Sequence, residues 1–219
     1  MPQAIAETVF DVLYLGFALI TGFTMLFKGR TGLAKKLGCM AVLLGAGDAF
    51  HLVPRCYALF TTGLEANAAA LGFGKFVTSV TMTVFYLLLY IVWRDYFQVE
   101  GRKGLTVSMY VLTALRIGLC LLPQNAWLTY RQPLLYGILR NVPFAVMGVL
   151  IMVLFAQESR RTEDAAFRHL PLAVGLSFGF YLPVVLLSGV LPVIGILMIP
   201  KTLAYVWVIW MGWKICANY

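Results

Sequence analysis

Seven long stretches of apolar residues run along the chain, and short polar segments separate them. A helix needs about 20 mostly apolar residues to cross a bilayer, and each stretch comes close to that length. The pattern predicts transmembrane helices over Ala6–Phe27, Leu37–Phe60, Phe76–Phe97, Leu105–Leu122, Leu134–Phe155, Leu170–Val190 and Ile194–Ala217. We therefore expect an all-α integral membrane protein, a bundle of seven transmembrane helices in which residues 1–219 form a single polytopic domain.

The last two predicted helices are separated only by Leu191-Pro192-Val193. They could form a tight hairpin, or they could form one longer re-entrant element. Pro183 and Pro200 predict kinked helix ends in this region, which neighbouring helices can accommodate.

The composition agrees with a membrane protein. Hydrophobic residues make up 61% of the chain and charged residues only 12%, whereas soluble domains carry about 25% charged residues. Little of the chain is therefore left for a soluble domain. The formal net charge of +8 comes mainly from short loops and not from one basic face, which argues against nucleic acid as a partner.

The basic residues are distributed unevenly among the predicted loops. The loops after the first, third and fifth helices and the end of the seventh helix contain most of them, namely Lys28, Arg30, Lys35, Lys36, Arg102, Lys103, Arg160, Arg161, Arg168 and Lys214. Because cytoplasmic loops are enriched in Lys and Arg, we predict the amino terminus outside and the carboxyl terminus in the cytoplasm. We expect a multi-pass protein of the plasma (inner) membrane whose basic rim faces anionic membrane lipids.

Most of the predicted helices also contain an ionisable residue. Counted from the helix ends, these residues gather in the outer half of the membrane: Asp11, Asp48, His51, Arg55, Arg116, Arg140 and Lys201. Charge at membrane depth is costly, so such residues usually face a bundle interior or a water-filled cavity. We expect a shared polar cavity that opens outward, although long Arg and Lys side chains near helix ends could instead reach the lipid headgroups.

The second predicted helix has the most specific arrangement. Asp48, His51 and Arg55 are spaced i, i+3 and i+7, which places them on one helix face. Asp48 and His51 are one turn apart, so they could share a proton and act as a catalytic pair. The same stripe could also be a salt-bridge network that only fixes the register of the helix.

The charges of the predicted cavity do not balance, because two acids face four cations, namely Arg55, Arg116, Arg140 and Lys201. Such an excess is unstable in a low dielectric. Either Lys201 is neutral, or an anion completes the site. A phosphate or carboxylate headgroup on an apolar tail would suit a cavity open to the outer leaflet. We expect Tyr205, one turn from Lys201, and Tyr86 of the third helix to contact this ligand as well.

Metal or cofactor chemistry is not indicated. The cysteines are scattered without metal-ligand spacing, and the two histidines, His51 and His169, are predicted on opposite sides of the membrane. A zinc hydrolase would need about three or four ligands together. Lys201 lies near the end of its helix and not at its middle, which disfavours a retinal cofactor. We expect no metal and no cofactor.

The second helix also resembles a known family. Gly47-Asp48, followed by Leu52, Pro54 and Arg55, is similar to a segment of the YhhN-type lysoplasmalogenases. A glycine at position 72 or 74 and the tyrosines at positions 86 and 90 continue the similarity. The family usually has one more span and a second intramembrane acid in its later half. Here the acids of the later half (Glu158, Glu163 and Asp164) are expected in a cytoplasmic loop.

The resemblance implies hydrolysis of a vinyl-ether or similar bond in a lysophospholipid. Asp48 would act as general acid or base with His51 as its proton partner, and the cations at positions 116, 140 and 201 would hold the phosphate. Two other functions stay open. A proton-coupled transporter could use Asp48 and His51 as a proton relay, and a seven-helix receptor or sensor could bind its ligand in the outer cavity.

Overall fold

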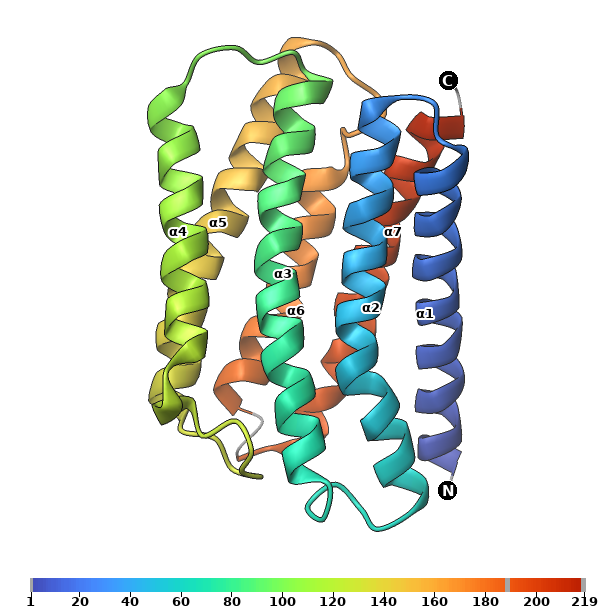
Figure 1. The fold of residues 1–219 in the computed structure, drawn as a ribbon, viewed down its shortest axis with the longest axis vertical. Helices are drawn as coiled ribbons and strands as arrows, with labels where there is room; N and C mark the ends of the chain where they lie inside the picture. The colour runs from blue at the N-terminus through green and yellow to red at the C-terminus, as the bar shows by residue number, and fades with distance from the viewer. Residues whose placement is uncertain (1, 188–189, 218–219) are drawn as a thin grey trace.

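The computed structural model describes residues 2–187 and 190–217. In these ranges the chain forms seven α-helices and two 3-10 helices, and it contains no β-strand (Figure 1). The elements are α1 (Pro2–Lys28), α2 (Gly32–Phe60), α3 (Ala68–Tyr96), α4 (Lys103–Leu121), η1 (Pro123–Asn125), α5 (Leu134–Arg161), α6 (Leu170–Leu187), η2 (Pro192–Leu197) and α7 (Met198–Ala217). The predicted all-α fold with seven helices long and apolar enough to cross a membrane is confirmed for the described residues.

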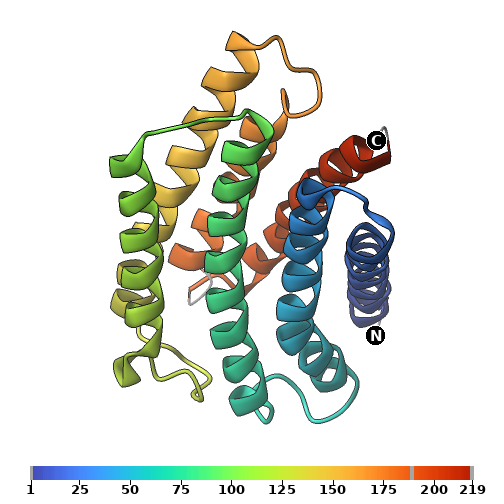
Figure 2. The same cartoon turned by 45° about the horizontal axis from the view of Figure 1, so that its top comes forward.

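Consecutive helices pack side by side and run in opposite directions. α1 to α4 form the front row of Figure 1, and α5 to α7 lie behind them, an arrangement that is also visible in Figure 2. α7 contacts both α1 and α2 and so closes the ring. The chain starts and finishes at opposite ends of the bundle, which we call the amino end (bottom of Figure 1) and the carboxyl end (top).

Aromatic side chains fill the middle of the bundle. Tyr86, Tyr90 and Trp93 of α3 are at most 1% exposed. The Tyr86 ring meets the ring of Phe144 on α5 edge-on with centroids 4.8 Å apart, and it meets that of Phe178 on α6 at 5.8 Å. Such aromatic contacts contribute packing attraction. This attraction matters because lipid tails are as apolar as the helices and give no hydrophobic drive for helices to associate.

Glycines let α2 and α3 approach each other closely. Gly47 of α2 lies against Thr81 of α3, and Gly74 of α3 lies against the α2 backbone at Phe50 and His51. Small residues at such positions allow close contact between helices in membranes. The contact fixes the rotation of α2 and therefore the direction of its polar face.

Helix α3 begins earlier than predicted. It starts at Ala68, about two turns before Phe76, so Lys75 lies inside the helix and not at its end. The preceding turn is held by Asn67, whose Nδ2 donates to the carbonyl oxygen of Gly63 at 2.8 Å. The alanines that follow favour a helix although they are only weakly apolar, which is why hydropathy placed the start too late.

Helices α6 and α7 are separate antiparallel helices in contact with each other, which agrees with a hairpin and not with a re-entrant element. The α-helical part of α7 begins at Met198 and not at Ile194, because Pro192–Leu197 forms a 3-10 helix. The predicted end of the sixth span includes Ser188 and Gly189, which lie outside the described residues.

A methyl group at position 74 would collide with the backbone of α2, so we predict that Gly74→Ala lowers the free energy of unfolding by about 1–3 kcal/mol. Thermal unfolding of the detergent-solubilised protein measures this change. Gly118→Ala is the matched control, because nothing lies within 4 Å of the position that its Cβ would take. An unchanged midpoint for Gly74→Ala would contradict the close approach of α2 and α3.

Candidate functional site

Asp48 is half-buried near the middle of α2, and it faces α1. The hydroxyl of Tyr14 on α1 donates a hydrogen bond to Asp48 Oδ2 at 2.6 Å. Tyr14 is only 3% exposed, so this contact lies inside the bundle. A hydrogen bond to a carboxylate is about twice as strong as one between neutral groups. Tyr14 was not among the predicted site residues, because a tyrosine in an apolar stretch does not stand out in the sequence.

Lys201 enters the same region from α7. Its side chain is buried, with 9% of the residue exposed, and its charge attracts that of Asp48 across the interior. The Nζ atom lies 5.0 Å from the ring centroid of Tyr181 on α6 and 5.4 Å from that of Tyr205 on α7. An ammonium within about 6 Å of an aromatic face is attracted by the ring. The rings of Tyr181 and Tyr205 therefore stabilise the Lys201 ammonium group.

Arg116 of α4 is the second buried cation. Only 2% of the residue is exposed, and its Cζ lies 3.4 Å from the ring centroid of Phe144. Its Nε and Nη1 atoms have no hydrogen-bond partner among the described residues. The guanidinium group thus stacks on one ring while two of its donor atoms remain unpaired.

These contacts join into one set, which we call the central cluster. Tyr205 and Tyr86 have their hydroxyl oxygens 3.4 Å apart, and Tyr86 packs on the same Phe144 ring that carries Arg116. Every helix contributes to the central cluster, whose members are Tyr14, Asp48, Tyr86, Arg116, Phe144, Tyr181, Lys201 and Tyr205. Of the residues that the sequence predicted for the site, it contains Asp48, Tyr86, Arg116, Lys201 and Tyr205.

The remaining polar residues of α2 have partners on other helices. The Nδ1 atom of His51 lies 3.2 Å from the carbonyl oxygen of Leu71 on α3, and it donates there because a carbonyl can only accept. Arg55 forms an ion pair with Glu7 of α1, with Nη2 3.0 Å from Oε2. The predicted stripe of three ionisable residues exists, but Asp48 and His51 each have a different hydrogen-bond partner.

Asp11 and Arg140 also lie in separate contacts. The Cys56 thiol donates to Asp11 Oδ2, with the two atoms 3.6 Å apart. Arg140 donates from Nη1 to Asn125 Oδ1 at 2.7 Å, and its guanidinium group lies over the Trp127 ring at 4.2 Å. Asn125 is fully buried and belongs to η1. Arg140 therefore anchors the segment between α4 and α5.

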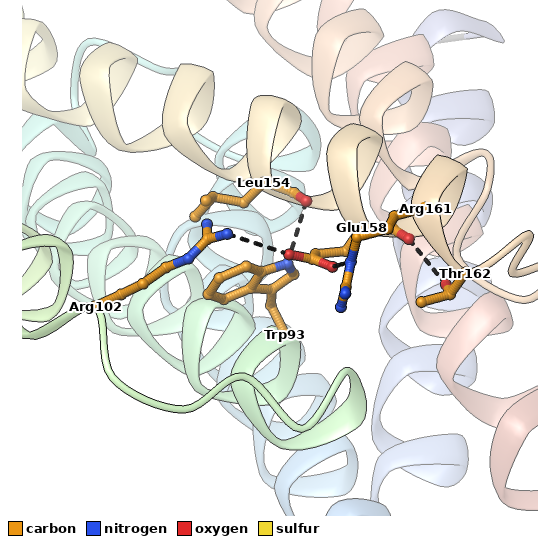
Figure 3. A network of polar contacts seen from close by, with 6 residues as sticks. All are labelled: Trp93, Arg102, Leu154, Glu158, Arg161 and Thr162. Atoms are coloured by element: carbon orange, nitrogen blue, oxygen red, sulfur yellow. Dashed lines mark hydrogen bonds and ion pairs between the residues drawn. The ribbon is translucent and has the colours of Figure 1, made fainter.

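A second cluster of polar side chains surrounds Glu158 at the carboxyl end (Figure 3). The prediction that Glu158 lies in a loop is wrong, because the residue belongs to α5 and its side chain is only 5% exposed. It pairs with Arg161 at 2.6 Å and with Arg102 at 3.4 Å. Beside it, the indole of Trp93 donates to the carbonyl oxygen of Leu154 at 3.2 Å. The predicted helix ended at Phe155, nearly two turns before the end of α5 at Arg161, because the last residues of the helix are polar.

Two of the surface hollows among the described residues lie at the carboxyl end. The larger, about 430 Å³, is lined by Arg94, Asp95 and Thr106, and the smaller, about 200 Å³, by Lys28 and Arg30 among others. Neither is lined by the central cluster, so the outward-facing cavity remains a prediction. The described residues also contain no group of three His, Cys, Asp or Glu side chains that could hold a metal ion.

No protein family model matches this chain, and no curated protein or solved structure is similar enough to match it. The resemblance of the second helix to YhhN-type lysoplasmalogenases stays a prediction. The function is therefore inferred from the residues of the central cluster.

Because Glu158 joins α5 to the loop before α4, we predict that Glu158→Gln lowers the free energy of unfolding by about 1.5–3 kcal/mol through weaker hydrogen bonds to the two arginines. Chemical or thermal unfolding in detergent measures this. Glu100→Gln, at an exposed residue near the same end, is the control and should leave stability unchanged. Equal stability of the two variants would mean that the Glu158 contacts contribute nothing.

Proposed function

We propose that the protein is a lipid-directed hydrolase of the plasma (inner) membrane, with its amino end outside and its carboxyl end in the cytoplasm. The basic residues of the loops support this orientation, because Lys28, Arg30, Arg102 and Arg161 all lie at the carboxyl end. The substrate is an anionic, lysophospholipid-like amphiphile that reaches the central cluster from the outer leaflet.

The observation that carries the proposal is the placement of Asp48. Its half-buried carboxyl group accepts a hydrogen bond from the hydroxyl of Tyr14, which is buried on α1. A carboxyl held in a fixed orientation away from bulk water is suited to general acid–base catalysis. In this arrangement Tyr14, and not His51, is the hydrogen-bond partner that orients Asp48.

The proposed reaction is hydrolysis of a vinyl ether. Asp48 in its acid form donates a proton to the vinyl carbon remote from the ether oxygen, which leaves an oxocarbenium ion. Water adds to the carbon bound to oxygen and returns one proton to Asp48. The resulting hemiacetal breaks its bond to the glycerol oxygen and gives an aldehyde and a glycerophospho-alcohol. One water is consumed, and Asp48 is regenerated.

A proton-coupled transporter is the second candidate, and one observation favours it. Glu7, Asp11 and Asp48 follow one another along the contact between α1 and α2, from the amino end to the interior, and the charge of Asp11 interacts with those of both other acids. Such a series could pass protons between bulk water and Asp48. An assay in detergent micelles distinguishes the two functions. A hydrolase still forms product in micelles, whereas a transporter has no second compartment to fill.

We predict that Asp48→Asn lowers turnover of an alkenyl lysophospholipid at least about 100-fold, because the amide cannot exchange the proton. Release of the aldehyde from the purified protein in detergent is the measurement. Tyr14→Phe, which removes only the hydrogen bond to Asp48, should cause a smaller loss.

Asp95→Asn is the matched control, because Asp95 pairs with Lys36 at the carboxyl end in a partly exposed contact that contributes little to stability. Substrate binding and the unfolding midpoint of Asp48→Asn are measured alongside turnover. Lost turnover with retained binding supports an acid or base at Asp48. Full turnover of Asp48→Asn would refute the hydrolase proposal.

A further inference from the structure

Arg116 is buried without the partners that a buried guanidinium group normally has. It is 2% exposed, and Nε and Nη1 donate to nothing among the described residues. A charge removed from water is costly unless it is paired and hydrogen-bonded. The Phe144 ring at 3.4 Å attracts the cation from one face, but a ring accepts no hydrogen bond in the guanidinium plane.

The nearest acid of the central cluster is already engaged. Asp48 accepts from Tyr14 and attracts Lys201, while Lys201 and Arg116 repel each other. When Lys201 is protonated and Asp48 is ionised, the two cations and one carboxylate leave an excess of one positive charge in the central cluster. One further negative charge would balance the cluster, whereas a doubly charged group would reverse the imbalance.

The other cations that the sequence predicted as ligand contacts are engaged elsewhere. Arg55 pairs with Glu7, and Arg140 is bonded to Asn125 and stacked on Trp127. Of the four predicted cations, only Arg116 and Lys201 belong to the central cluster. The anion site therefore contains two of the four cations that the sequence predicted for the cavity.

We infer that Arg116, with Lys201, forms a binding site for a group of single negative charge, either a phosphodiester or a carboxylate. The hydroxyls of Tyr86 and Tyr205 lie in the same cluster and can donate to such an oxyanion. The Phe144 ring beneath the guanidinium group adds an apolar wall. This inference rests on the proposed function in one respect, since both place an anionic headgroup in the central cluster. It concerns the binding of that group and not its hydrolysis.

The depth of Arg116 fits a ligand that arrives from the amino end. The residue lies five positions before the end of α4 at Leu121, which corresponds to about 8 Å along the helix axis. A lipid headgroup or a free small anion could supply the same charge at this depth. The two sources differ in the apolar tail, which only the lipid carries.

The probes are oleate and lysophosphatidylglycerol, each with one negative charge, and acetate as a free anion. 1-Monooleoylglycerol, which has an acyl chain but no charged group, is the control ligand. We expect the singly charged amphiphiles to raise the unfolding midpoint of the detergent-solubilised protein, because a ligand that binds the folded state stabilises it. Arg116→Met should weaken their binding at least about 30-fold. Arg131→Gln, at an exposed cation of the amino end, should keep wild-type binding.

The outcomes separate an anion site from a structural role. Without ligand, Arg116→Met should be at least as stable as the wild type, because it removes an unpaired buried charge. Stabilisation by acetate as strong as that by oleate would identify a free anion as the ligand. Equal stabilisation by 1-monooleoylglycerol, or equal binding of the charged amphiphiles to Arg116→Met, would overturn the inference. If Arg116→Met fails to fold, the inference is also overturned, because the arginine would then be a satisfied structural residue. Turnover is not measured, so a failure of the hydrolase proposal leaves this test unaffected.

Discussion

Ionised side chains inside an apolar bundle need partners, and this need organises the interior of the protein. In a low dielectric, attraction between paired charges is strong and an unpaired charge is costly. Asp48 meets this requirement through Tyr14 and Lys201, whereas Arg116 meets it only in part, through the Phe144 ring. Because the central cluster takes at least one side chain from every helix, a rotation of any helix would disturb it.

Helix α2 has a special position, because its polar face is shared between two neighbours. Gly47 and Gly74 bring α2 and α3 together, and this contact fixes the rotation of α2. Asp48 then faces α1, while the imidazole of His51 reaches the backbone of α3. The two residues that could have formed a catalytic pair are separated in this way, and the acid–base chemistry is left to Asp48 in the central cluster.

Polar contacts between neighbouring elements stabilise both ends of the bundle, and the Arg55–Glu7 ion pair joins α1 and α2 at the amino end. At the carboxyl end, ion pairs join neighbouring elements, as between Lys36 and Asp95 and between Glu158 and Arg102. At the amino end, the buried Asn125 and its bond to Arg140 hold the segment between α4 and α5. The central cluster lies between these contacts, so its side chains are positioned by helices that are fixed at both ends.

The sequence by itself determined the number and type of the helices. A stretch of about 20 apolar residues can satisfy its backbone hydrogen bonds inside a membrane by forming a helix. The sequence also predicted that Asp48, Arg116 and Lys201 face the interior, and the two cations are indeed buried. Periodicity could not give their partners, because it assigns a face to one helix and not the neighbour that covers it. Only the tertiary structure showed that Tyr14 donates a hydrogen bond to Asp48 and that His51 bonds to a backbone carbonyl of α3. These pairings depend on how the helices rotate and pack, which is a property of the whole bundle.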